Sequence, residues 1–279
     1  HNFHPTMLQH VGLKRCAEPE EYAKTGNKML LVRKPCLSEQ EFLQRTIDTF
    51  AALGAEQRKH SLRFYWLGDE QSITGYGGAP IDFCFSQDCL REFRHFLKQK
   101  YADLDAVNRE WECNFATWDE VVPFTKEEIW ENNSKNVAGW ADHLEFMDGR
   151  LENIVRLCAQ AARKNDPAAE FSISGTQAPT AYGGMDWWRQ MKVFDGLMNY
   201  PYVGGQHELQ RSFRPDAKFI PWEFGYRSRG GIMGYKIWRT LFTGCRGIMG
   251  FSYPSLVNPD WSLSKGMADS LPHFQILTT

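Results

Sequence analysis

Short apolar segments that recur at nearly even intervals constrain the fold of this chain more than any other feature of its sequence. The segments FSISG, FDGLMNY, KFIPWE and GIMGFSY begin at Phe171, Phe194, Lys218 and Gly247, so successive starts lie 23, 24 and 29 residues apart. Each interval is long enough for a helix, and GYKIWRTLFTG at 234–244 has the apolar clustering of one. Strands that alternate with helices predict βαβ units and a parallel sheet, which is the α/β class.

A fifth apolar segment, SLRFYWLG at 61–68, predicts a buried strand much earlier in the chain. Five βα units are too few for a closed eight-stranded barrel. We therefore interpret residues 1–279 as a single catalytic domain, a partial (β/α)8 TIM barrel in which strands four to eight are visible and the first strands are lacking. The chain starts at His1, so an N-terminal truncation would explain the shortfall and leaves export undecided.

Two helices are predicted from apolar stripes that follow a capping residue. One begins at Ser38 in SEQEF, where Ser and Glu form the pattern of a capping box, and the other at Ser86 in SQDCLREFRHFLKQKY. Residues 1–37 lack periodicity and predict a long loop. The Trp-rich stretch 102–145 predicts an irregular excursion within the domain.

Charge, hydropathy and cysteine usage exclude several kinds of partner. Lys and Arg total 32 against 34 Asp and Glu, a net charge of −2 without a basic stripe, so we expect no nucleic acid. Apolar runs are far shorter than a membrane span. The seven scattered cysteines are not a disulfide framework and slightly favour a reducing, cytoplasmic location, although the compartment stays unknown and an oligomer is allowed.

Carboxylates stand at the ends of two predicted strands. Asp69 and Glu70 end the first strand, and Glu223 follows the apolar run of the fourth. In a TIM barrel such strand ends build the active face, and a glycosidase needs two carboxyl groups there. One protonates the leaving oxygen, and the other either attacks the anomeric carbon or activates a water molecule. The candidate substrate-binding residues lie at the same strand ends or in the loops after them: Asp69, Gln177, Trp187, Asn199, Tyr200, Trp222 and Tyr253. For Trp187, packing at a helix start weighs equally with a sugar subsite.

The sequence after the first strand resembles glycoside hydrolase family 42, the β-galactosidases of clan A. GDEQS and the following FCFSQDCLREFRHFLKQKYADLDAVNREWECNFATWDEV are similar to the segment after that family's acid/base. VFDGLMNYPYVG is similar to its strand-six segment, in which an Asp precedes Asn-Tyr-Pro. The resemblance covers about residues 60–255 and is most specific over 84–118. The positions that match the family's order are Phe93, Phe96, Leu97, Tyr101, Leu104, Asn108 and Trp111.

This resemblance implies a (β/α)8 barrel that hydrolyses terminal β-galactosides with retention. Carried over to this chain, Glu70 is the acid/base after strand four and Glu223 the nucleophile after strand seven, with a glycoside or oligosaccharide as substrate. Two departures keep alternatives open: Asp69 stands where the family usually has Asn, and strand eight ends in FSYPS. A catalytically inactive carbohydrate-binding barrel is one alternative, and a metal-dependent hydrolase with a non-sugar substrate is another.

Some family members bind a structural zinc through a cysteine cluster in this region. In this chain Cys84 and Cys89 fall in the loop with C-x4-C spacing, and Cys36 and Cys113 are distant candidate helpers. Tetrahedral zinc takes four ligands and generally includes a tighter pair. We therefore expect ordinary thiols here, with no metal and no other cofactor.

Overall fold

A computed structural model describes the chain in twelve stretches: residues 18–60, 65–69, 73, 82, 84–133, 135–176, 185–199, 205–216, 221–224, 231–245, 247–250 and 257–278. Within them, five strands form one sheet in the order β1-β2-β3-β4-β5, and every neighbouring pair is parallel. The strands are β1 (Tyr65–Asp69), β2 (Phe171–Thr176), β3 (Gly196–Asn199), β4 (Pro221–Phe224) and β5 (Gly247–Gly250).

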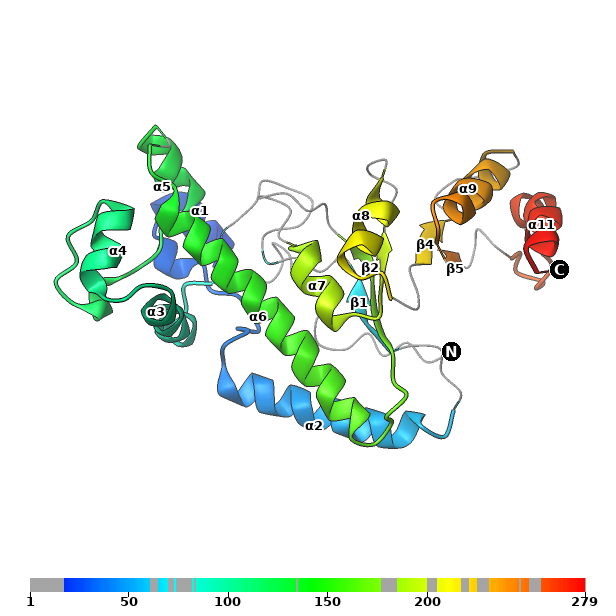
Figure 1. Ribbon diagram of the computed structural model, residues 1–279, viewed down its shortest axis with the longest axis horizontal. Helices are drawn as coiled ribbons and strands as arrows, with labels where there is room; N and C mark the ends of the chain where they lie inside the picture. Colours follow the sequence, from blue (N-terminus) through cyan, green and yellow to red (C-terminus); the bar gives the residue numbers. More distant parts are fainter. Residues whose placement is uncertain are drawn as a thin grey trace.

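Helices connect every strand of this sheet to the next, as the sequence predicts (Figure 1). A parallel neighbour needs a crossover connection, so each strand must be followed by a segment that returns over the sheet. The α/β class and the five βα units are confirmed for the described residues. The helices of the second half are α7 (Trp187–Val193), α8 (Gln206–Phe213), α9 (Gly231–Phe242) and α11 (Lys265–Thr278).

The two longest helices of the described residues, α2 (Gln40–Gln57) and α6 (Ala138–Arg163), pack against each other, and the C-terminal part of α6 meets α2 below the strands (Figure 1). Their backbones meet at Gly54, where a Cβ atom would lie only 2.3 Å from the carbonyl oxygen of Ala162. A residue without a side chain is therefore required at this crossing. Among the helices of the described residues, none combines the length and the apolar character that crossing a membrane demands.

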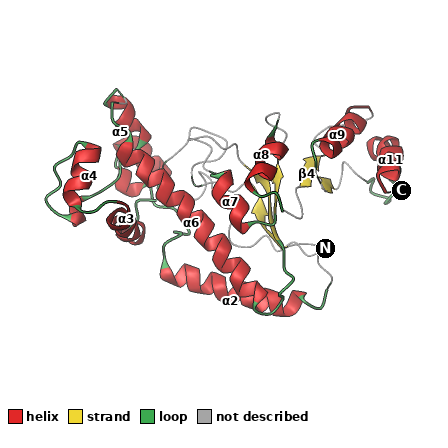
Figure 2. Ribbon diagram, in the orientation of Figure 1, coloured by secondary structure: helices red, strands yellow, loops and turns green. Residues whose placement is uncertain are grey.

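The stretch 102–145, predicted to be irregular, contains three helical elements and the start of a fourth. These are α4 (Leu104–Trp111), η3 (Trp118–Glu120), α5 (Lys126–Glu131) and the first turns of α6. Side-chain caps start two of them: Asp103 accepts from the amide of Ala106 at 2.8 Å, and Thr125 forms a capping box with Glu128. Figure 2 shows this helical group beside α3 (Gln87–Lys100) and apart from the strands.

The N-terminal segment also differs from its prediction as a loop. Its described part contains α1 (Pro19–Thr25) and η2 (Lys28–Leu30). Ser38 is not the N-cap of α2, since Glu39 holds that position and its side chain makes no capping bond. The Ser38 hydroxyl instead lies 3.7 Å from Cys89 Sγ. The predicted N-cap of α3 is confirmed, because Ser86 Oγ accepts from the amide of Cys89 at 3.2 Å.

Candidate functional site

The carboxyl ends of the five strands lie along one edge of the sheet, because all of its strands run in the same direction. β1 ends at Asp69 and β3 at Asn199. In the register of the sheet, Asn199 pairs with Trp222, and Glu223 pairs with Met249 of β5. The backbone therefore places the predicted nucleophile and three predicted substrate-binding residues near this single edge.

The other predicted site residues fall into two groups. Glu70, Gln177, Tyr200 and Tyr253 lie outside the described residues. For Asp69, Asn199, Trp222 and Glu223 the description covers the backbone only. The convergence of Glu70 and Glu223 on one glycosidic bond thus stays a prediction.

Trp187 is a core residue rather than a sugar contact. It is the first residue of α7, and its side chain is only 1% exposed within the main hydrophobic cluster. Helix α7 starts at the N-cap Asp186, whose side chain accepts from the amide of Arg189 at 3.0 Å. The exposed aromatic surface at this helix start belongs to Trp188, which is 52% exposed and has Lys192 Nζ at 2.9 Å from its ring centroid.

Behind the start of α7, a group of acids surrounds one arginine. Asp148 of α6 accepts a hydrogen bond from the amide of Asp186 at 3.1 Å. Arg189 contacts Glu145 at 3.2 Å and Asp186 at 3.3 Å. Burial raises the pKa of Asp148 to about 7, although the Asp186 amide and Arg189 act in the opposite direction. This group fixes the helix that follows the loop after β2.

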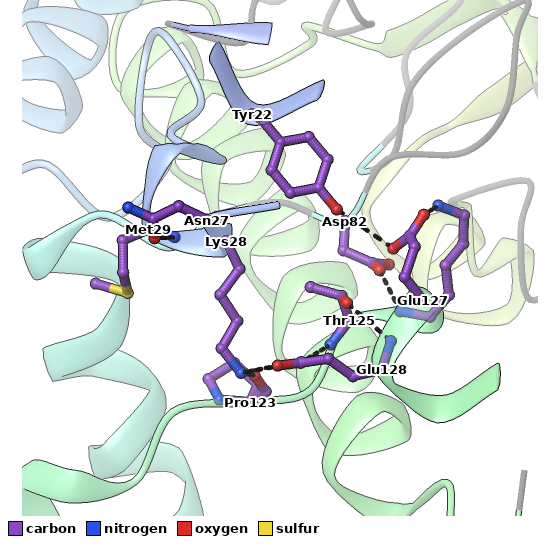
Figure 3. A network of polar contacts seen from close by, with 10 residues as sticks. Tyr22, Asn27, Lys28, Met29, Asp82, Pro123, Thr125, Glu127 and Glu128 are labelled. Atoms are coloured by element: carbon purple, nitrogen blue, oxygen red, sulfur yellow. Dashed lines mark hydrogen bonds and ion pairs between the residues drawn. The ribbon is translucent and has the colours of Figure 1, made fainter. Parts of the chain in front are cut away.

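A polar network holds Asp82, which lies between β1 and α3 in the sequence (Figure 3). Asp82 is buried and accepts from the amide of Lys126 at 2.7 Å and from the indole of Trp140 at 3.0 Å. Lys28 of η2 binds Glu128 of α5 at 2.9 Å. Burial raises the pKa of Asp82, and its two donors partly offset that effect. The network ties η2, Asp82 and α5 into one support.

Three cysteines from separate parts of the chain come together beside this support. The Sγ atoms of Cys36, Cys84 and Cys89 all lie within 4.8 Å of one another, and all three residues are buried. Cys36 follows η2, Cys84 precedes α3, and Cys89 lies in the first turn of α3. Of the two distant helpers considered from the sequence, Cys36 belongs to this group, which we call the cysteine cluster, and Cys113 does not.

The surroundings of the cysteine cluster favour thiolate at one sulfur. Hydrogen bonds from Cys36 and Cys89 lower the pKa of Cys84 well below its usual value, and the amide of Arg33 donates to Cys84 Sγ at 3.3 Å. The Arg33 guanidinium is itself buried and donates to the carbonyl of Ile73. Burial lowers the pKa of Arg33 to about 10, while the neighbouring sulfurs raise it. Deprotonated sulfur is the form that binds a soft metal ion, so the donor set fits zinc.

Arg33 and Asp82 were not among the predicted site residues, although one feature of the sequence points to both. Each is a charged residue inside a short apolar run, LLVRKPCL and APIDFCF respectively. A charged side chain that is buried with such a run is expected to have partners, because leaving it unpaired in an apolar environment costs several kcal/mol.

A family comparison identifies the group of proteins to which this chain belongs. The sequence model of glycoside hydrolase family 42, described as β-galactosidase, matches residues 19–220, well over half of the chain. This chain belongs to glycoside hydrolase family 42. The expected resemblance is therefore confirmed, and the solved structures similar to this chain are TIM-barrel glycoside hydrolases.

The curated and solved relatives of this family 42 member are much longer than the chain itself. β-Galactosidase BgaA of Planococcus sp. (strain 'SOS Orange') is 28% identical over 164 residues, which are 52% of this chain and 23% of that protein. β-Galactosidase bgaB of Geobacillus kaustophilus is 24% identical over 269 residues, 86% of this chain and 37% of that protein. The chain thus spans less than two fifths of either relative.

Among solved structures, a catalytic mutant of Gan42B, a family 42 β-galactosidase from G. stearothermophilus, matches with a TM-score of 0.68. The sequence identity is 14%, and the match covers 87% of this chain and 40% of that one. At this identity the likeness concerns the fold. It agrees with the parallel sheet and the order of its strands.

Proposed function

We propose that this chain is the catalytic part of a retaining glycoside hydrolase that acts on β-linked sugars, in the manner of a β-galactosidase. The observation that carries the proposal is the family match over residues 19–220, combined with a glutamate, Glu223, at the carboxyl edge of a parallel sheet. Glu70 is the acid/base and Glu223 the nucleophile. No cofactor is needed for this chemistry.

The proposal requires that the sheet curve as part of a barrel. β1 and β4 are separated by two strands, so in a flat sheet their backbones would lie about 14 Å apart at about 4.8 Å per step. Carboxyl groups that act with retention lie about 5–5.5 Å apart. In a barrel, strands three positions apart face each other across the interior, and their side chains converge. Residues 1–279 would then form one partial barrel domain, with 102–145 as an excursion from it.

The reaction follows from these two roles in two displacements. Glu223 attacks the anomeric carbon while the protonated Glu70 gives its proton to the departing oxygen, so the glycosidic bond breaks and a glycosyl ester forms on Glu223. Glu70, now a carboxylate, takes a proton from a water molecule that attacks the same carbon and releases Glu223. Two inversions give net retention of the β-configuration.

The remaining strand-end residues serve to hold the sugar. Asp69 and Asn199 are the last residues of β1 and β3, and Trp222 of β4 pairs with Asn199. Asp69 accepts from a sugar hydroxyl where the family usually places an Asn amide. The other substrate contacts that we propose are Gln177, Tyr200 and Tyr253.

The test distinguishes the roles of the two glutamates by how the rate of each variant depends on the leaving group of the substrate. With Glu70→Gln, kcat/KM, which reports the first displacement, falls by about 10²–10⁴-fold on an alkyl β-galactoside and much less on a dinitrophenyl β-galactoside, whose leaving group needs no proton. With Glu223→Gln, both substrates lose activity alike, because the attack itself is removed. Wild-type protein that binds galactosides but hydrolyses neither substrate faster than the two variants would overturn the proposal and favour a carbohydrate-binding barrel.

A further inference from the structure

The five described strands contain acidic residues but no basic one. Their charged residues are Asp69, the last residue of β1, and Glu223 of β4, and none of these strands contains Lys, Arg or His. Glu70 follows Asp69 directly in the sequence and adds a third carboxyl group. The carboxyl edge of the sheet, where the substrate is proposed to bind, is therefore acidic in composition.

The two helices that follow β2 and β3 offer no free positive charge at their starts. Arg189 lies in the first turn of α7, where its guanidinium contacts Glu145 at 3.2 Å and Asp186 at 3.3 Å. Helix α8 has Glu208 in its first turn. Burial lowers the pKa of the adjacent His207, which favours its neutral form. Neither helix start thus supplies a cation to the three carboxyl groups.

The proposed reaction fixes the charge of two of these three groups. Glu223 attacks as a carboxylate, and Glu70 begins the reaction protonated. Asp69 takes no part in either displacement, and an aspartate side chain is normally ionised near neutral pH. Asp69 therefore brings a negative charge to a position where the family usually has a neutral Asn.

The place of this extra charge in the chain points to the second carbon of the sugar. Glu70 protonates the oxygen on the anomeric carbon, and the Cα atoms of consecutive residues such as Asp69 and Glu70 lie about 3.8 Å apart. Retaining glycosidases gain rate from hydrogen bonds to the group on the next carbon, which is a hydroxyl in ordinary sugars. An Asn amide can donate to a hydroxyl as well as accept from it, whereas a carboxylate only accepts and bonds most strongly to a charged donor.

We propose that the substrate is a β-linked amino sugar, a 2-amino-2-deoxyhexoside, whose ammonium group pairs with Asp69. This inference rests on the proposed function and names its substrate class. The contact of Asp69 is then with an ammonium group in place of a hydroxyl, and the two charges cancel. A neutral sugar would cover the carboxylate without a charged partner, which is unfavourable in a site closed to water. The N-acetylated sugar carries a neutral amide at the same carbon and lacks this pairing.

Binding to the Glu223→Gln protein tests the pairing without turnover. The full chain with this change is titrated calorimetrically, near neutral pH, with the methyl β-glycosides of galactosamine and of galactose. We expect the amino sugar to bind about 10²-fold more tightly, because a hydrogen bond between charged partners is about twice as strong as a neutral one. Adding Asp69→Asn should abolish this preference and leave the affinity for the galactoside unchanged. Adding Asp105→Asn, at an exposed position of α4, is the matched control and should preserve the preference.

Hydrolysis by the wild-type protein separates this inference from the proposed function. We expect kcat/KM on the nitrophenyl β-glycoside of galactosamine to exceed that on the nitrophenyl β-galactoside about 10²-fold, and Asp69→Asn to remove the difference. Hydrolysis of the galactoside, with no tighter binding of the amino sugar, would overturn the amino-sugar assignment and leave the glycosidase standing. Tighter binding of the amino sugar without hydrolysis of either glycoside would support the pairing and overturn the proposed function. A preference that survives Asp69→Asn would overturn the role of Asp69.

Discussion

Replacing Asp148 by Asn tests whether a buried carboxyl beside α7 makes stability depend on pH. Its pKa is raised from 3.8 to about 7 by burial, among Asp186, Glu145 and Arg189. The folded protein therefore keeps a proton that the unfolded chain loses above pH 4. Because the folded state binds more protons in this window, the free energy of unfolding falls as pH rises from about 4 to about 7, and it then stays at its lower level.

The magnitude follows from the size of this rise in pKa. Each tenfold change in proton affinity is worth about 1.4 kcal/mol, so the loss in the free energy of unfolding between low and high pH is at most about 4 kcal/mol. Partial exposure of the side chain reduces this loss to about 2 kcal/mol. Asn keeps an oxygen that can accept from the Asp186 amide at the observed 3.1 Å, but it carries no charge. We expect Asp148→Asn to match the wild type near pH 4.5 and to be about 2 kcal/mol more stable at pH 8.

Urea unfolding of both proteins at the two pH values measures this difference. Asp105→Asn, a change of the same type at an exposed position of α4, is the matched control, and it should behave alike at both pH values. If Asp148→Asn gains no stability between pH 4.5 and pH 8, the buried carboxyl is not the cause. A loss of stability at pH 8 would show that its charge supports α7 through Arg189, contrary to our reasoning.

Two further predictions concern the packing of α6 with its neighbours. Asp142→Ala should lower the free energy of unfolding in urea by about 3 kcal/mol, because the buried indole of Trp111 loses its acceptor at 2.8 Å; a loss below about 1 kcal/mol would contradict this. Gly54→Ala should lower the midpoint of thermal unfolding, because its Cβ would lie 2.3 Å from the carbonyl oxygen of Ala162. Overpacking of this kind costs about 1–3 kcal/mol of folding free energy. The control Gly149→Ala, with no atom within 4 Å of the new Cβ, should raise the midpoint through its gain of about 1 kcal/mol in helix propensity; equal effects of the two changes would refute the close crossing.

Local sequence patterns predicted an element correctly where the residues that form it all lie within one short segment. The five strands were predictable because each is a short apolar run between turn residues, and Ser86 was predictable as a cap because its partner amide lies three residues away. The same local logic failed at Ser38, whose hydroxyl contacts Cys89, a partner 51 positions away. It also failed over 102–145, where α4 packs on α6 and its Trp111 stacks on Phe93 of α3, a partner outside its own segment.

The sequence by itself determined the α/β class, the alternation of strands and helices, and the likeness to family 42, since these depend on composition and order along the chain. Only the tertiary structure decided which residues meet: it buried Trp187 and exposed Trp188, joined Cys36 to Cys84 and Cys89, and enclosed Asp82 in a network. Side chains far apart in sequence are brought together by the crossovers between parallel strands, and no pattern within one segment encodes where those crossovers end.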